Sequence, residues 1–336
     1  MRYPSMHHIG LGYWLAASWL SLVIIIGLLA PLLPLSFAPA TPDLLHIAAA
    51  PEWVGAGPQH WLGTDPQGRD VLAGLVYGAR QVVLLSLPAT LLATAFGALA
   101  GSAAGYWGNR DLRLPLAGWF LVLAGSWWLL DLPSKGVIVP GLLVLSIAAG
   151  VAQLRSYPRW LAHTAWPVPL DALLRGLLTL LGAVPRLILV IGLAAGPPLT
   201  AVKLLGLLVA VAWTDPARLV RTQMLRVREL PFVEAARAAG LPTWRIWLRH
   251  ALPHASLPLR TTTPLSLAGL IGLETTLSFL GVGLPPDVPS WGRLLGTLRQ
   301  APGAWWLVVG PGLALLLTLL ALRQLASDSS QQVKRA

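Results

Sequence analysis

The chain has few residues of the types that act as nucleophiles, general acids or metal ligands, and their spacing does not indicate a catalytic site. Cysteine is absent, which excludes disulfides, thiolate nucleophiles and cysteine metal ligands. His250 and His254 are four residues apart and could share a helix face, but Pro253 lies between them and no acidic residue is close. The other histidines are scattered over the terminus and different loops, at His7, His8, His46, His60 and His163. No metal or catalytic site is therefore predicted.

Composition places the chain in a membrane. Of the 336 residues 55% are hydrophobic and 11% are charged, whereas soluble proteins are about 45–50% apolar and about 25% charged. The net charge of +11 does not indicate nucleic-acid binding, because the basic residues lie between apolar runs and form no basic stripe on a polar domain. The sixteen Trp are typical of membrane interfaces, where an apolar ring keeps a hydrated N–H.

The apolar runs predict an all-α polytopic membrane protein with six core transmembrane helices. The run from Leu11 to Leu33 is longer than the h-region of a signal peptide, about 7–15 residues, so we expect an uncleaved first span. The other core runs lie at about 82–107, 172–195, 199–213, 257–284 and 302–322. The predicted organisation is a tail and first span at 1–33, an external loop at 34–80, a transmembrane domain at 81–322 and a cytoplasmic tail at 323–336.

The distribution of positive charge predicts the orientation. If the N-terminus is cytoplasmic, most of the 24 Lys and Arg residues fall on the cytoplasmic side, where such residues collect. Both termini are then predicted to be cytoplasmic, and residues 34–80 and 284–301 external.

The longest predicted cytoplasmic stretch, 215–253, has helical periodicity. Apolar residues such as Leu219 and Met224 alternate with basic ones such as Arg218 and Arg221. Gly240 and Pro242 predict two short helices with a break between them, because Gly ends helices and Pro begins them. One interpretation of this stretch is a basic amphipathic helix on the lipid surface.

The same stretch resembles the EAA signature of ABC importer permeases. Glu234-Ala-Ala, Gly240 six residues later and Leu252-Pro253 after a further gap match it, while His250 replaces the usual isoleucine, as in the peptide-importer branch. The resemblance implies a type I importer permease fold, in which this segment is a coupling helix that docks on an ATPase subunit. The coupling residues it implies are Glu234, Ala235, Ala236, Arg237, Gly240, His250 and Pro253.

Two further blocks resemble the C-type subunits of dipeptide, oligopeptide and nickel importers. One runs from His60 to Leu72 and the other from Glu274 to Gly283, continued by Pro289-Ser-Trp-Gly292. From the residues themselves, Asp65 or Asp70 could accept backbone N–H bonds and Arg69 could pair with a carboxylate. Glu274 lies in an apolar run, and either a path-lining or a structural hydrogen-bonding role stays open. The predicted external-loop and gate residues are Gly63, Asp65, Gly68, Arg69, Asp70, Glu274, Ser278, Phe279, Gly281, Pro289, Trp291 and Gly292.

Residues 114–152 depart from the family pattern. Two short apolar runs, 114–130 and 137–152, flank a turn that contains Asp131, Pro133 and Lys135. We expect an inserted helical hairpin that crosses or dips into the membrane at the periphery of the core, bringing the total to about eight hydrophobic spans. The alternative is that the hairpin borders the solute path.

The resemblance implies a multi-pass subunit of the bacterial inner membrane with several partners. These are a second related permease, two ABC ATPase subunits and an external substrate-binding protein. The chain's three lysines follow no phosphate-cradling G-x-x-x-x-G-K-[ST] loop, so no cofactor is expected on this chain, and ATP and Mg²⁺ are expected on the partners.

Two other classes of protein remain as alternatives. An ion-coupled carrier would need several intramembrane acids or an inverted repeat, and only Glu274 qualifies. An intramembrane enzyme would need a catalytic cluster. Which solute is carried, whether a dipeptide, a longer peptide, a nickel chelate or another small molecule, cannot be read from the sequence.

Overall fold

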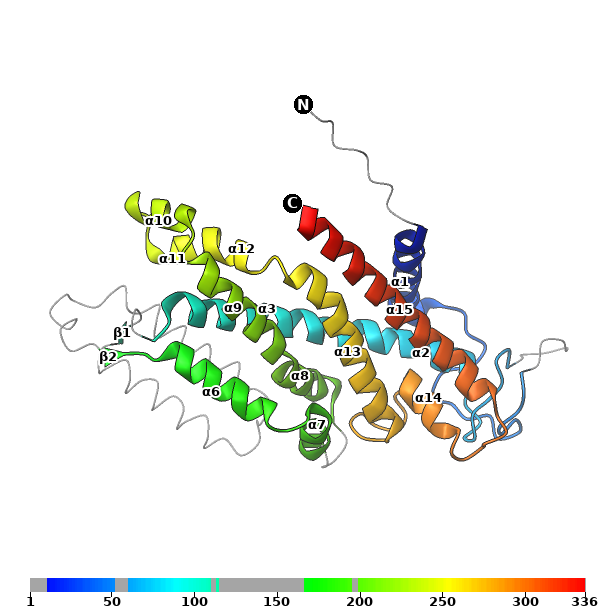
Figure 1. Ribbon diagram of the computed structural model, residues 1–336. Coiled ribbons are helices and arrows are strands. Elements are labelled where there is room, and N and C mark those ends of the chain that lie inside the picture. The colour runs from blue at the N-terminus through cyan, green and yellow to red at the C-terminus, as the bar shows by residue number, and fades with distance from the viewer. Residues whose placement is uncertain (1–10, 52–59, 110–112, 115–165, 195–198, 336) are drawn as a thin grey trace. The chain divides into compact units, whose positions relative to one another are not determined.

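The protein is built almost entirely of helices, as Figure 1 shows. The computed structural model describes residues 11–51, 60–109, 113–114, 166–194 and 199–335. The chain divides into two compact units, one of Met1–Leu91, Leu187–Leu205 and Arg260–Ala336, the other of Leu92–Arg186 and Gly206–Leu259. The prediction of an all-α membrane protein is confirmed.

The first unit packs its N-terminal helix α1 (Leu11–Leu29) against the C-terminal helix α15 (Trp306–Arg335) and against α2 (Val71–Gln81). Trp19 Nε1 donates to Thr318 Oγ1 at 3.1 Å, which joins α1 to α15. Val23, Ile271 and Leu322 are among the buried apolar residues between these helices. The other elements of this unit are η1 (Ala30–Leu32), η2 (Val82–Ser86), α7 (Arg186–Ala194), α13 (Leu259–Phe279) and α14 (Trp291–Thr297).

The second unit is centred on α3 (Leu87–Trp107) and α9 (Thr214–Val227). Three glycines one turn apart, Gly97, Gly101 and Gly105, lie on the face of α3 that meets α9. A Cβ at Gly97 would lie 2.5 Å from the carbonyl oxygen of Trp213, so only glycine permits this approach. The unit also contains α6 (Leu170–Gly182) and most of α8 (Ala201–Ala212).

A two-residue antiparallel ladder joins the start of the predicted insertion to a strand that follows it in the sequence. β1 (Arg113–Leu114) pairs with β2 (Trp166–Pro167), with Arg113 opposite Pro167 and Leu114 opposite Trp166. The expected hairpin within 114–152 lies outside the described residues, apart from Leu114 itself. Its position and its role therefore stay predictions.

Three described helical segments are long and apolar enough to cross a membrane: Leu11–Leu32, Val71–Trp107 and Trp306–Ser329. α6 and α7 together give a fourth candidate. The number of six core spans stays a prediction, because α8 is short and α13 does not reach the same apolarity over its length.

Three predicted boundaries differ in the structure. The helix expected to begin near residue 82 begins at Val71, because Asp70 caps it. The expected span at 172–195 is interrupted between Gly182 and Arg186, where Pro185 cannot continue a helical ladder. The last helix does not end near residue 322 but continues to Arg335, so the predicted tail is helical.

Candidate functional site

The predicted coupling segment is a compact series of short helices. After α9 the chain forms α10 (Pro231–Ala238), α11 (Thr243–Arg245), the π-helical turn η4 (Ile246–Ala251) and α12 (Leu252–Ala255). Leu230 is extended and Pro231 occupies the first turn of α10, where a missing N–H costs nothing. The predicted break between two short helices is confirmed.

Gly240 ends α10 in a Schellman motif. Its φ of +74° lies in the left-handed region, which favours glycine. Its N–H donates to the carbonyl of Arg237 at 3.0 Å, and the N–H of Leu241 donates to the carbonyl of Ala236 at 3.2 Å. Pro242 then precedes α11. The reversal is therefore fixed by two backbone hydrogen bonds and by one residue that tolerates positive φ.

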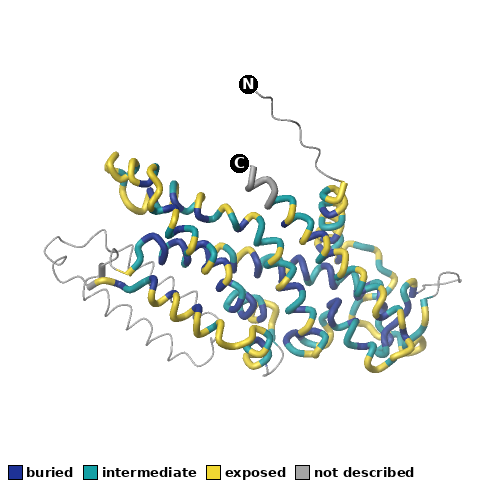
Figure 2. The backbone as a smooth tube through the Cα atoms, viewed as in Figure 1, coloured by how far each residue is buried: buried dark blue, intermediate teal, exposed yellow. Residues whose placement is uncertain are grey.

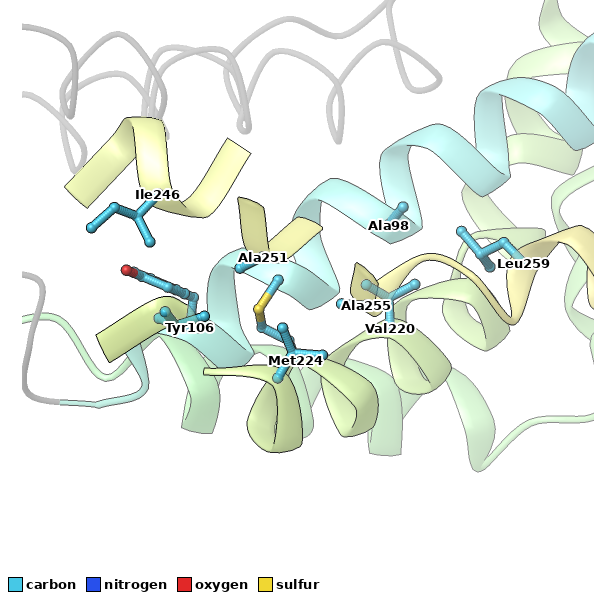
Figure 3. Close-up of a cluster of buried hydrophobic side chains, with 10 residues drawn as sticks. Ala98, Tyr106, Val220, Met224, Ile246, Ala251, Ala255 and Leu259 are labelled. Atoms are coloured by element: carbon cyan, nitrogen blue, oxygen red, sulfur yellow. The ribbon is translucent and has the colours of Figure 1, made fainter. Parts of the chain in front are cut away.

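One side of α10 is anchored in a buried apolar cluster. Val233 is fully buried there, together with Met224 of α9 and Ile246 of η4, while Tyr106 of α3 is 4% exposed. Figure 3 shows Met224, Ile246 and Tyr106 converging from three different helices. Burying Val233 and Ile246 stabilises the segment by about 1.5–3 kcal/mol each. Because this cluster includes residues of α3 and α9, α10 is packed on the two central helices of the second unit.

Ring contacts and a hydrogen bond add to this anchor. The ring centroids of Phe232 and His254 are 4.8 Å apart, a contact that connects α10 to α12. The ring centroids of Trp107 and Trp247 are 4.9 Å apart. Arg228 Nη1 donates to the carbonyl of Gly105 at 3.2 Å. The segment is thus tied to α3 at several points.

The opposite side of α10 is open to solvent. Glu234, Ala235, Arg237 and Gly240 are exposed, and Ala236 is half-buried against the cluster. Figure 2 shows exposed backbone running along α10 and its turn. His250 is half-buried in η4 and Pro253 is exposed in α12. Four of the seven predicted coupling residues are therefore exposed along α10 and its turn, and Arg237 also places its guanidinium 5.7 Å from the ring centroid of Tyr106 in the cluster.

The loop before α2 is ordered by two aspartates, as the sequence predicted. Asp65 Oδ1 accepts the N–H groups of Gln67 and Arg69, both at 2.8 Å. Burial raises the pKa of Asp65, although these two N–H groups act to lower it. Asp70 accepts the N–H of Ala73 at 2.7 Å and caps α2. Gly63 and Gly68 have φ of 77° and 76° in the same loop.

Among the described residues Arg69 forms no ion pair with a carboxylate, the pairing that the sequence allowed. Its Nη1 donates instead to the carbonyl oxygen of Pro286 at 2.8 Å. The loop before α2 and the loop before α14 are therefore joined through a side chain and a backbone group.

The predicted gate residues near α14 lie in tight packing. Trp291 is 3% exposed, and its Nε1 donates to the carbonyl of Leu75 at 2.9 Å. Gly292 lies directly against the backbone of Thr275 in α13. Pro289 precedes Ser290, whose hydroxyl accepts the N–H of Arg293 at 3.2 Å and caps α14. Trp291 and Gly292 thus hold α14 against its neighbours.

Glu274 is buried in α13 and is 3% exposed. Its Oε1 accepts a hydrogen bond from Ser278 Oγ at 2.7 Å, one turn along the same helix. Phe279 ends α13, and Gly281 follows with φ of 76°. This geometry favours the structural interpretation of Glu274, since its carboxylate has a partner within its own helix.

Sequence reasoning missed one cluster. Asp43, His46 and His60 each place a possible metal-ligand atom within 4.8 Å of the others. The hydrogen bond with His46 and that from the N–H of Leu45 lower the pKa of Asp43 to about 2. The spacing of Asp43 and His46 could have signalled a pair, but nothing local predicts that His60 joins them.

The described helices, several of them long and apolar enough to cross a membrane, have the organisation of a multi-pass membrane protein. Comparison with known proteins identifies the family. Residues 159–328 match the family described as binding-protein-dependent transport system inner membrane component.

The chain is 30% identical over 251 residues to the peptidoglycan transport system permease protein YejE of Agrobacterium fabrum, covering 75% of this chain and half of that protein. It is 30% identical over 269 residues to a provisionally named peptide transport system permease of Brucella suis, covering 79% of this chain and 70% of the other. A second provisionally named peptide permease of that organism is 30% identical over 294 residues, covering 86% and 75%.

The chain therefore belongs to the binding-protein-dependent inner-membrane transport components, the permeases of ABC importers, and it resembles the peptide branch.

Proposed function

We propose that this permease carries peptides or other small solutes across the inner membrane, and that the segment 215–253 couples it to ATPase subunits. The observation that carries the proposal is the two-sided character of α10. Val233 is buried in the cluster with Met224 and Ile246, while Glu234, Ala235 and Arg237 face solvent. Because α10 is packed on α3 and α9, a displacement of α10 by a bound partner would be transmitted to those two helices.

The free surface suits a protein partner better than lipid. Ala235 and Ala238 let a groove approach the helix closely, and Glu234 offers a charge for a specific pair. A helix lying on lipid would present large apolar side chains on its free face. The apolar residues Val233 and Phe232 instead pack against their own protein.

The substrate class rests on the relatives. Their names refer to peptides and to peptidoglycan, and peptide-like solutes are the natural first candidates for this chain. A nickel chelate or another small solute is the second candidate, on the resemblance of its loops. An external binding protein would deliver the solute to the loops at 34–80 and 284–301, and a second related permease would complete the pathway.

Reversing the charge of Glu234 tests the coupling surface. We expect Glu234→Lys to weaken ATPase association at least tenfold and to reduce uptake in parallel, because placing like charges against each other across an interface costs several kcal/mol. The measurement is co-purification with the ATPase subunits together with uptake in membrane vesicles.

The matched control is Asp287→Lys, the same charge change at an exposed acid before α14. It should leave ATPase association unchanged. Equal loss of association in both variants, or none in Glu234→Lys, would contradict the proposed docking surface.

Energy supply gives a second test. We expect the purified chain to hydrolyse ATP no faster than background, because none of its three lysines follows a phosphate-cradling loop. The measurement is phosphate release by the isolated permease and by the reassembled complex. Hydrolysis that follows this polypeptide through purification in the absence of partners would reject the assignment of ATP chemistry to other subunits.

A further inference from the structure

Three side chains in the loop before α2 meet at one carboxylate oxygen. His46 Nδ1 lies 2.8 Å from Asp43 Oδ2, and His60 Nε2 lies 3.3 Å from the same atom. Ligands of a tetrahedral zinc ion, each about 2.0–2.2 Å from the metal, stand about 3.3 Å from one another. The two separations from Asp43 Oδ2 are at or below this value, and all three ligand atoms lie within 4.8 Å of one another, so rotations of these side chains would suffice to enclose an ion.

The hydrogen bond made by His60 Nδ1 determines which nitrogen of this ring is directed at Asp43. His60 Nδ1 lies 2.9 Å from Asp70 Oδ1, and an ionised carboxylate can only accept, so Nδ1–H donates to Asp70. His60 Nε2 is the nitrogen that faces Asp43, and its lone pair is available to a cation whenever that nitrogen carries no proton. A carboxylate behind a ligating histidine is also the usual second shell of protein metal sites.

The site is held firmly on one side and is open on the other. His60 is 5% exposed, and the ring of Phe37 stacks on it with centroids 3.9 Å apart. His46 is exposed, and Asp43 is partly so. An ion could therefore enter from solvent against an imidazole whose orientation is already set.

We propose that Asp43, His46 and His60 bind a divalent transition-metal ion of the zinc type. The ligands are Asp43 Oδ2, His46 Nδ1 and His60 Nε2, and a water molecule takes the fourth position. Two imidazoles and one carboxylate suit zinc, whereas magnesium and calcium take oxygen ligands. The ion would link residues 43–46 to residues 60–70. This metal site does not depend on the proposed coupling of α10 to an ATPase.

The test is zinc binding by the purified permease. The protein carries a tag without histidine and the changes His7→Ala and His8→Ala, so that the terminal histidine pair cannot contribute. After removal of metal with a chelator, Zn²⁺ is titrated by calorimetry and bound metal is counted by elemental analysis. We expect one ion per chain, and loss of at least 100-fold in affinity in His46→Ala.

Two further variants separate a built site from chance binding. His254→Ala removes an exposed histidine in α12, outside the cluster, and should bind zinc as the parent does. Asp70→Asn keeps a good helix cap but replaces the carboxylate behind His60 with a neutral amide, and should reduce affinity about 10–100-fold. Asp43→Asn, which keeps the side-chain shape, serves if His46→Ala does not purify as a monodisperse protein.

Co²⁺ gives an independent signal, since a four-coordinate site produces an intense visible absorption. We expect this band in the parent and in His254→Ala, and its loss in His46→Ala and Asp43→Asn. Absence of zinc binding in the parent, or equal binding in the parent and both cluster variants, would overturn the proposal. Because the isolated chain is measured without ATPase or solute, neither result bears on the proposed transport function.

Discussion

Replacing Gly240 with proline should abolish solute uptake while leaving the protein inserted in the membrane. Proline fixes φ near −65°, whereas Gly240 has φ of +74°, and proline also removes the N–H that donates to Arg237. The turn between α10 and α11 would then have to take another path, and the exposed face with Glu234 would no longer point where it does. Uptake in vesicles and co-purification with ATPase subunits are the measurements.

Gly240→Asn is the matched control at the same position. Asparagine tolerates the left-handed region, and a Cβ at this position meets nothing within 4 Å. We expect this variant to keep most of the uptake. Normal uptake by a well-expressed Gly240→Pro protein would count against a role for the turn.

The second large effect is expected at Gly101, where α3 and α9 meet. A Cβ at this position would overlap the carbonyl oxygen of Ala217, and the neighbouring atoms are backbone rather than a side chain that could move aside. Overpacking typically costs 1–3 kcal/mol and sometimes more. Here we expect Gly101→Ala to reach about 3 kcal/mol and to lower the unfolding temperature by on the order of 10 °C.

Gly176→Ala provides the comparison. Gly176 also lies in a helix of the second unit, but its Cβ would meet nothing within 4 Å. Alanine is the better helix former, so this variant should unfold at the parent temperature or slightly above it. Thermal unfolding in detergent, followed by the loss of monodisperse protein, would show the difference. Equal stability of the two variants would mean that the helices can separate at Gly101 without cost.

Local signals allowed the sequence to predict the helix break within residues 215–253. Gly240 and Pro242 determine a helix end and a helix start through their own backbone preferences, so the break between α10 and α11 did not depend on distant contacts. The same holds for Asp65 and Asp70, whose carboxylates accept N–H groups two to four residues further on. The partner of their neighbour Arg69 could not be read in this way, because Pro286 comes from a distant loop.

Other features were missed because they depend on contacts between segments that are far apart in the sequence. The stretch Val71–Gln81 was assigned to the loop, but it is helical and packs Gly78 against Trp291 of α14. The cluster of Asp43 and His46 gains His60 only through the fold of the loop. Neither contact leaves a periodic pattern in the sequence, so hydrophobic spacing alone could not reveal it.

The pairing of β1 with β2 has a consequence for engineering. Leu114 and Trp166 are partners across the ladder, so the two chain positions that flank residues 115–165 lie next to each other. Any replacement for that segment has to join two neighbouring points, which a short turn or a reporter domain with adjacent termini can do.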